Sequence, residues 1–431
     1  MKNIILSVAA MLALTAFMPQ ASAVPAFARQ TGKACTTCHF QHFSALNDYG
    51  QDFKASGYTE VGKQGTLKGD DVSLPTVLNA ALFLKARYQK TNGTDGVDAA
   101  NNPVVTSHGG EIHFPDEFAL LLGGRITENM GFLVESQFAG GDGTGKNFLA
   151  GLKLPIMFAV NESGMKAGVV PFLTDGLGAS YGFELLSTGA VRNIRVNEHS
   201  AETSAHQYVF YNGPGAASGL AFALYDPKYF LVYTKYTPHH MSVEGSNTGN
   251  LDAGLIRAVW TPTVGDFVLG VGVQSYIGTH MRMVEAGVVN KYVDTKGTAL
   301  DFQAQGVAGS MPVGVYITYA TAPASTATAE NLFNAETNGE RKATTLLTEL
   351  GIVPNRATVQ LAYRIADNGA ATNNNDNAWT VAGIYHMAQN VQLSLTHTKN
   401  TGDARYDNSP AGTTGNVGGD SLTTLMLASG F

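Results

Sequence analysis

Residues 35–39 have the types and the spacing of a covalent cofactor site. Cys35 and Cys38 are the only two cysteines among the 431 residues, two residues separate them, and His39 follows directly. Two thiols at this spacing on a helical turn reach the two vinyl groups of a haem, and the next histidine lies under the iron as proximal ligand. The motif therefore predicts one covalent haem c, attached through Cys35 and Cys38 and ligated by His39.

Two other uses of a Cys-x-x-Cys pair fit the sequence less well. A structural zinc site would need a second pair of Cys or His residues at ligand spacing nearby. A thioredoxin-like redox pair would need a βαβ context, which the sequence does not predict. Haem attachment therefore remains the favoured chemistry.

The residues after the motif predict a small haem-binding segment that ends near residue 68. Apolar and aromatic side chains recur there at roughly helical spacing, with Gly50 and Gly57 placed for a close backbone approach or a helix end. On such a helix His42 falls on the same face as His39, so we expect it to make hydrogen bonds rather than to be the distal ligand, whose identity stays open. The pocket candidates are His42, Phe43, Leu46, Tyr49, Phe53 and Tyr58.

The first 23 residues read as a secretory signal peptide. Lys2 precedes an apolar run from Ile4 to Phe17, and Ala21-Ser22-Ala23 is a small-x-small cleavage site. The apolar run is too short to span a membrane. Export agrees with the motif, because haem is attached to such motifs outside the cytoplasm. We therefore expect a signal peptide (1–23), a monohaem c-type cytochrome domain (24–68) and a remainder (69–431).

Composition separates the remainder from ordinary soluble domains. The chain is only 14% charged and contains 49 glycines, whereas soluble domains carry more charge. Without Lys2 it has 26 basic and 34 acidic side chains, a formal charge of −8. This balance argues against nucleic acid as a partner.

From residue 75 onward the apolar pattern changes to a period of two. Leu78, Ala80 and Leu82 alternate with Asn79, Ala81 and Phe83, and similar alternation recurs to the end of the chain. We expect about sixteen strands, an even number as in outer-membrane barrels. They cover residues 79–89, 117–126, 131–139, 148–160, 165–172, 206–212, 219–236 (read as one strand with a bulge at Asp226-Pro227), 251–260, 266–275, 298–308, 312–320, 342–351, 356–366, 378–387, 391–398 and 421–431.

Connection lengths and the last strand support a barrel over a soluble β-sandwich. The chain ends on Ser429-Gly430-Phe431 after alternating Leu425 and Leu427, and a terminal aromatic strand of this kind commonly closes an outer-membrane barrel. Short links at 127–129, 161–164, 262–264 and 388–390 alternate with long Gly/Asn/Thr-rich ones such as 91–114 and 173–205. Short periplasmic turns and long outer loops are typical of outer-membrane barrels. The sequence thus predicts a mainly β protein, an antiparallel outer-membrane barrel containing a small α-helical cytochrome plug.

The amino-terminal segment matches a known pattern at several short stretches. The matching residues are Pro25-Ala26-Phe27-Ala28-Arg29-Gln30-Thr31-Gly32, Cys35-Thr36-Thr37-Cys38-His39, Leu46-Asn47, Gly50, Phe53-Lys54 and Gly57-Tyr58-Thr59. With these residues the segment resembles the cytochrome domain of the fused monohaem cytochrome–porins of iron-oxidising bacteria. The resemblance implies an outer-membrane oxidoreductase that takes electrons from extracellular Fe(II), through one haem, to a periplasmic carrier such as a soluble cytochrome. Ser44 and Gln51 depart from that pattern, where Pro and Arg are expected.

Two rival functions remain compatible with the sequence. One is a solute porin in which the haem plug is only a redox gate or a structural stopper, and the other is a conduit that exports electrons to an extracellular acceptor. A discrete Fe(II) site is not required for outer-sphere electron transfer, and exposed loop residues of the same types need not bind metal. The metal-ligand candidates are His108, Glu111, His113 and Asp116 in one loop, His199, Glu202 and His206 in another, and His239-His240.

Inward-facing polar side chains of the strands are expected to bond the plug or the haem propionates. Lys85, Arg87, Gln360 and Arg364 are the candidates.

Overall fold

The computed structural model describes most of the chain, and the predicted signal peptide lies outside the described part. The described residues are 26–43, 45–69, 73–97, 100–104, 107–140, 148–189, 204–210, 215–240, 250–282, 291–403 and 418–431.

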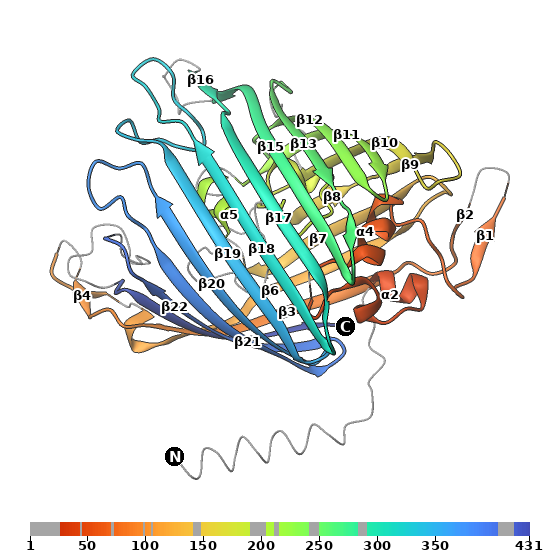
Figure 1. The fold of residues 1–431 in the computed structure, drawn as a ribbon, viewed down its shortest axis with the longest axis horizontal. Coiled ribbons are helices and arrows are strands. Elements are labelled where there is room, and N and C mark those ends of the chain that lie inside the picture. The colour runs from red at the N-terminus through yellow and green to blue at the C-terminus, as the bar shows by residue number, and fades with distance from the viewer. Residues whose placement is uncertain are drawn as a thin grey trace, which may run out of the picture.

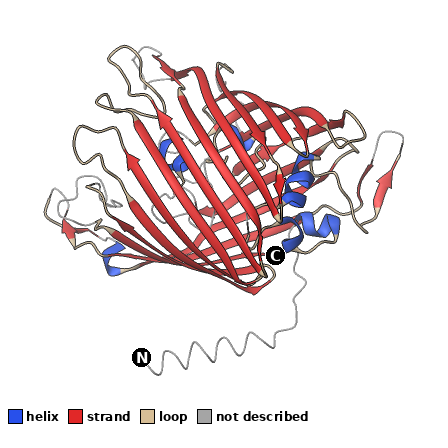
Figure 2. Cartoon of the chain, viewed as in Figure 1, coloured by secondary structure: helices blue, strands red, loops and turns tan. Residues whose placement is uncertain are grey.

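A closed antiparallel barrel of sixteen spans forms the body of the protein (Figures 1 and 2). Three spans are interrupted and consist of two strand segments each. The spans are β3 (Ala80–Thr91), β6 (Glu111–Arg125), β7 (Gly131–Gly140), β8 with β9 (Leu149–Lys153, Ile156–Ala159), β10 (Lys166–Thr174), β11 (Ala217–Asp226), β12 (Tyr229–Thr237), β13 with β14 (Ala253–Trp260, Thr263–Val264), β15 (Phe267–Arg282), β16 with β17 (Lys291–Asp294, Gly297–Ala308), β18 (Met311–Ala322), β19 (Arg341–Val353), β20 (Ala357–Asp367), β21 (Ala378–Ala388), β22 (Val391–Asn400) and β23 (Ser421–Gly430).

The remaining elements are short. The helices are α2 (Ala26–Thr31), α3 (Cys35–Cys38), α4 (Asp48–Ala55) and α5 (Ala205–Phe210), with 3-10 turns η1 (Ser107–Gly109) and η2 (Ala179–Tyr181). Two small hairpins pair β1 (Thr66–Lys68) with β2 (Ser73–Pro75) and β4 (Gly96–Val97) with β5 (Pro103–Val104). No helix in the described part of the chain is long and apolar enough to cross a membrane.

The predicted alternation of side chains holds along the strands. On β20, Leu361 and Ile365 are exposed on the outside of the wall, whereas Gln360 and Arg364 are buried on the inside. A closed wall with an apolar exterior leaves no unpaired strand edge and can face lipid. The protein is therefore an outer-membrane barrel, and its apolar exterior suits contact with membrane lipid.

Closure joins the last strand to the first. β23 pairs with β3, and Leu82 and Phe431 exchange two backbone hydrogen bonds of 2.7 and 2.9 Å between nitrogen and oxygen. The apolar residues Leu425 and Leu427 face outward. The expectation that the aromatic C-terminal strand closes the barrel is confirmed.

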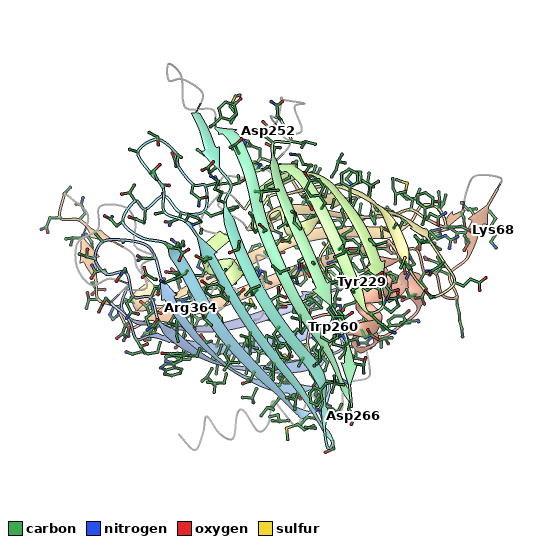
Figure 3. All side chains as sticks on the ribbon, turned by 45° about the horizontal axis from the view of Figure 1, so that its top comes forward. Lys68, Tyr229, Asp252, Trp260, Asp266 and Arg364 are labelled. Carbon is green, nitrogen blue, oxygen red and sulfur yellow. The ribbon has the colours of Figure 1, made fainter. Side chains whose placement is uncertain are left out.

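Short turns lie at one end of the barrel and long connections at the other, as expected. Trp260 is 59% exposed at the turn end and pairs with Tyr229 of the neighbouring strand (Figure 3). Aromatic side chains favour the membrane–water boundary, which fits a periplasmic turn end.

Two strand predictions are wrong, and the errors cancel in the count. Residues 205–210 form helix α5 rather than a strand, and Ala205, His206, Tyr208, Val209 and Phe210 are all buried. Burial on every side hides the helical period, so the segment reads equally well as a short strand.

The second error concerns residues 219–236, which form the two strands β11 and β12. Asp226 pairs with Tyr229 across a two-residue turn that contains Pro227, and the Asp226 carboxylate accepts a hydrogen bond of 3.0 Å from the Lys228 backbone nitrogen. Proline sets φ for the turn, and the aspartate supplies its usual turn hydrogen bond.

The connection between β10 and β11 enters the barrel instead of forming a purely outer loop. The Ser187 backbone nitrogen donates to the Gln303 side chain at 2.9 Å, and the Thr188 hydroxyl donates to Asp301 at 2.7 Å. Both acceptors are inward residues of β17. We call residues 175–189 together with α5 the inner loop; Figure 1 shows α5 inside the wall.

We predict that the protein is recovered in the outer-membrane fraction of cells. The purified protein should migrate faster on a gel before heating than after it. A closed hydrogen-bonded wall resists detergent until heat opens it. Gel migration with and without boiling measures this. Recovery as a soluble periplasmic species would contradict the membrane assignment.

Candidate functional site around the Cys-x-x-Cys-His motif

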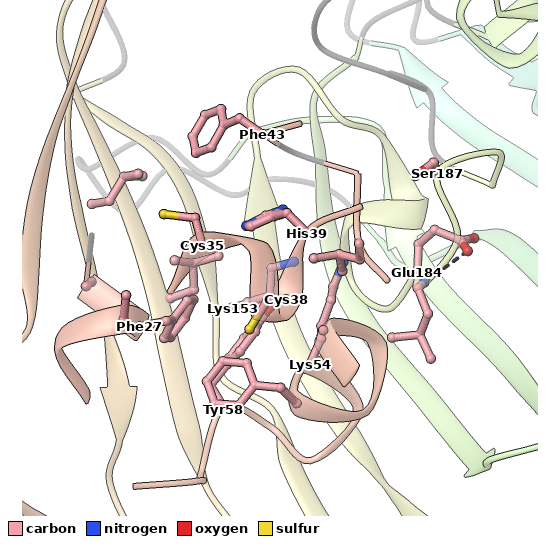
Figure 4. Close-up of a pocket in the computed structure, with 18 of the residues that line it drawn as sticks. Phe27, Cys35, Cys38, His39, Phe43, Lys54, Tyr58, Lys153, Glu184 and Ser187 are labelled. Carbon is pink, nitrogen blue, oxygen red and sulfur yellow. Dashed lines mark hydrogen bonds between the residues drawn. The ribbon is translucent and has the colours of Figure 1, made fainter. Parts of the chain in front are cut away.

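The cysteine motif faces a cavity of about 400 Å³. The helices α2 and α4 that border this cavity lie towards the turn end of the barrel (Figure 1). Figure 4 shows Cys35, Cys38 and His39 around this cavity together with Lys54 and Lys153. Its walls come from α2 to α4, from β6, β7 and β8, and from the inner loop. A volume of this size is in the range of ligand pockets.

The cavity wall is mainly apolar, and its aromatic rings pack on one another. Phe27 stacks on Tyr58 with ring centroids 4.6 Å apart, and Phe53 meets Phe27 edge-on at 5.2 Å. Leucines complete the wall from the barrel and the inner loop: Leu121, Leu133, Leu177, Leu185 and Leu186. Such a wall suits a large, flat, apolar ligand.

Both thiols of the motif are free and line the cavity. α3 spans only the four residues of the Cys-x-x-Cys pair, and the His39 nitrogen donates to the Cys35 carbonyl at 2.9 Å. Burial raises the pKa of the Cys35 and Cys38 thiols. Redox-active Cys-x-x-Cys pairs have a lowered pKa, so this environment disfavours thiol–disulfide chemistry.

The imidazole of His39 is held in the tautomer that binds a metal through Nε2. Nδ1 lies 3.2 Å from the Ala45 carbonyl oxygen, which can only accept, so Nδ1 carries the hydrogen. Nε2 then keeps its lone pair, the arrangement typical of metal-ligating histidines. Burial lowers the pKa of His39 to about 4, which keeps the ring neutral at physiological pH. The residues present therefore fit a covalently attached haem.

The pocket residues expected from the sequence are brought together in part. Phe43, Leu46, Phe53 and Tyr58 line the cavity. The single helix assumed for them is wrong, because α3 ends at Cys38 and α4 begins at Asp48.

Tyr49 and His42 are not among the lining residues. Tyr49 contacts Lys33 and Glu60 instead, in two short hydrogen bonds. These bonds tie the residues before the motif to those after α4.

The glycines behave as expected. A Cβ at Gly50 would lie 2.2 Å from the Cys38 carbonyl oxygen, so α4 can approach the motif only without a side chain there. Gly57 has a φ of +70° just after α4, a conformation that glycine adopts without strain.

His42 connects the amino-terminal segment, residues 26–69, to the barrel wall. Its Nε2 lies 2.7 Å from Glu349 Oε2 of β19 and 3.3 Å from Gln360 Nε2 of β20. All three residues are almost completely buried. His42 is thus a hydrogen-bonding residue, as expected, although the helical face invoked for it does not exist.

This contact predicts a pH-dependent attachment of the segment. Burial opposes a charge on His42, but the Glu349 carboxylate outweighs burial and raises the pKa of His42 above 6.5. Protonated His42 therefore stabilises the contact fully below pH 6.5. That stabilisation is lost as the pH rises through the pKa of His42 in the folded protein. We expect proteolysis of residues 26–69 in the intact barrel to accelerate with rising pH.

Glu349→Gln should weaken attachment by about 3 kcal/mol, because removing one partner of a buried pair leaves the other uncompensated. Its proteolysis should also lose the pH dependence. Glu340→Gln is the matched control, because Glu340 is exposed at the other end of β19. Equal pH profiles for the wild type and Glu349→Gln would contradict the assignment.

Besides Lys33, four charged residues line the cavity, and sequence reasoning assigned none of them to it. Lys54, Glu135, Lys153 and Glu184 come from α4, β7, β8 and the inner loop. Lys153 could have been noticed as an inward charge on a predicted strand. Glu184 carried no signal, because nothing in the sequence shows that its loop turns inward.

The inward polar residues bond mostly to the wall itself. Lys85 pairs with Glu117, and Arg87 Nη2 lies 2.8 Å from Asp116 Oδ1. Arg364 Nη2 lies 2.7 Å from Asp376 Oδ1. Gln360 contacts the amino-terminal segment through His42.

The two departures from the family pattern differ in what can be described. Gln51 is buried on α4, and its Nε2 has no hydrogen-bond partner in the described part of the chain. Ser44 lies outside the described residues.

The loop residues considered for iron do not form a metal site where they are described. No group of three or more His, Cys, Asp or Glu residues suited to a metal occurs in the described ranges. His113 pairs with Glu111 at 2.9 Å, and His206 is buried in α5. His239 packs against His280, and His199 and Glu202 lie outside the described residues.

No protein-family model and no curated protein matches the sequence. Among solved structures, the outer membrane channel DcaP of Acinetobacter baumannii has a TM-score of 0.47 and 13% identity over 85% of this chain and 100% of that one. An anion-selective porin from Comamonas acidovorans has a TM-score of 0.45 and 12% identity over 82% and 99%. At these TM-scores the likeness supports no conclusion about this chain.

Proposed function

We propose that this protein is an outer-membrane cytochrome that oxidises extracellular Fe(II) and passes the electrons to a periplasmic carrier. The carrying observation is the cavity that brings two free thiols and a neutral His39 together against an apolar wall. A bound haem c would supply one-electron redox chemistry there.

The amino-terminal segment acts in this proposal as a plug. Gln41 accepts a hydrogen bond from the Asn355 backbone nitrogen at 3.2 Å, and the Phe43 nitrogen donates to Gln392 at 3.1 Å. With the His42–Glu349 contact, these bonds attach the segment to three neighbouring places on the wall. The plug and the inner loop then exclude water and solutes while the cofactor stays fixed.

The motif lies close to the periplasmic end, which favours delivery to a soluble carrier there. Gln389, in the turn between β21 and β22, has its Nε2 3.8 Å from the Cys35 sulfur. An electron from outside must cross the lumen occupied by the inner loop. Aromatic rings of that region pack together, among them Phe210 and Tyr276 with centroids 4.5 Å apart. Ferric product stays outside, where mineral cannot fill the periplasm.

Mixing Fe(II) with the purified haem protein in a stopped-flow spectrometer tests the proposal, together with a potentiometric titration. Fe(II) should reduce the haem, and an oxidised soluble cytochrome should then reoxidise it. The Cys35→Ala, Cys38→Ala double variant is the control and should show no Soret change. Haem that Fe(II) does not reduce, in a protein that conducts solutes, would favour the haem-stoppered porin.

The exporting conduit makes the opposite prediction about potential. If the haem potential lies well below that of the Fe(III)/Fe(II) couple under the assay conditions, reduced haem will deliver electrons outward. The same titration therefore decides the direction of flow.

A further inference from the structure

Two lysines line the cavity without a carboxylate bonded to either amino group in the described part of the chain. Lys153 is only 4% exposed, and its Nζ donates to the Tyr181 carbonyl oxygen at 2.8 Å while lying 3.7 Å from the centre of the Tyr181 ring. Lys54 is half-buried, and among the described residues its Nζ has no hydrogen-bond or ion-pair partner. Buried cations are costly unless an anion pairs with them.

The charges around these lysines do not supply such a pair. The two ammonium groups act on each other as like charges. Glu184 attracts Lys54 electrostatically, but its carboxylate is bonded to Arg257 Nε at 2.9 Å and to the Leu186 backbone nitrogen at 2.9 Å. Glu135 attracts Lys153 electrostatically.

The third lysine of the cavity shows what a compensated cation looks like here. Lys33 Nζ lies 2.9 Å from Glu60 Oε1 and also bonds the Tyr49 hydroxyl. Lys54 and Lys153 therefore differ from Lys33 in having room for an anionic partner inside the cavity.

The proposed ligand carries anionic groups of the right number. Haem has two vinyl groups on one edge and two propionate carboxylates on the opposite edge. Thioether bonds to Cys35 and Cys38 would hold the vinyl edge at α3 and leave the two propionates free to meet other side chains of the cavity. Figure 4 shows Lys54 and Lys153 among the side chains around the cavity, with Lys54 on the side of Cys38 away from Cys35.

We propose that Lys54 and Lys153 bind the two haem propionates, an inference that rests on the proposed haem site. One lysine belongs to α4 and the other to β8 of the wall. The cofactor thereby joins the amino-terminal segment to the barrel, which the thioether bonds alone do not do. Both lysines are positioning residues that also set the charge beside the cofactor.

The test is the reduction potential of the full-length haem protein at pH 7 in Lys54→Met, Lys153→Met and the double variant. A nearby cation favours the ferrous form, which carries one positive charge less than the ferric form. Each single variant should therefore lower the potential, and the double variant should lower it further. Lys153→Arg should restore most of the wild-type value, because arginine also binds carboxylates.

Lys166→Met is the matched control, because Lys166 pairs with Asp52 at 2.7 Å and does not line the cavity. Its potential should stay at the wild-type value. If Lys153→Met does not assemble, Lys54→Gln at the half-buried helix position gives the deciding measurement. Covalent haem with an unchanged reduction potential in the Lys54 variants would overturn the inference. Loss of the low-spin spectrum in Lys153→Met would also overturn it, because Lys153 would then be an iron ligand. Absence of covalent haem from the wild type would instead contradict the proposed function.

Discussion

Replacing both Cys35 and Cys38 by alanine is expected to abolish haem staining of the denatured chain. A haem held only by His39 and by apolar packing leaves when denaturant opens the cavity, whereas a thioether bond survives. Each single alanine variant should keep part of the stain, because one thioether remains. Peroxidase staining of a denaturing gel, normalised to the amount of full-length chain, measures the effect.

The histidines of the segment should separate in the same experiment. His39→Ala should lose the low-spin Soret spectrum or fail to assemble. The reason is that Nε2 of His39 keeps a lone pair that can bind the haem iron. His42→Ala should keep the low-spin spectrum, because His42 is bonded to Glu349 and does not line the cavity. Persistent staining of the double cysteine variant would refute covalent attachment, and a high-spin spectrum in His42→Ala alone would contradict the assignment of His42.

Features that depend on nearest neighbours along the chain were predictable. The alternation on β20 follows from the strand repeat, and every second side chain meets lipid. Most of the sixteen spans and the position of the closing strand follow from the same repeat and from the turn residues. The Cys-x-x-Cys-His motif is equally local.

Features that depend on contacts between distant segments were not predictable. The prediction of an even strand count treats the turn at Pro227 as a bulge and so merges β11 and β12 into one strand. The same prediction treats helix α5 as a strand, which restores the count to sixteen. The His42–Glu349 contact joins residues 307 positions apart. Lys153 is recognisable as an inward strand residue, but the strand repeat does not show which segment it faces. Glu184 reaches the cavity only because the inner loop turns inward, and that turn leaves no pattern in the sequence.

The amino-terminal segment and the inner loop both occupy the barrel lumen, and this predicts how the barrel conducts ions. Deleting residues 24–68 alone should raise conductance only slightly, because the inner loop still occupies the lumen through Ser187, Thr188 and Glu184. Glu184 is held by Arg257 of β13, which also bonds Asp301 of β17 at 2.9 Å between Nη2 and Oδ2. This buried cluster fixes the loop independently of the amino-terminal segment.

Removing both fillings should produce a large steady conductance in planar bilayers, because sixteen strands otherwise enclose a water-filled channel. The second deletion replaces residues 176–215 by a short Gly/Ser linker between β10 and β11, and that loop deletion alone is the matched control. Each variant must first show heat-modifiable migration, so that a missing channel cannot be a missing barrel. Large conductance in the intact protein, or none in a correctly assembled double deletion, would show that the lumen is not closed by these two elements.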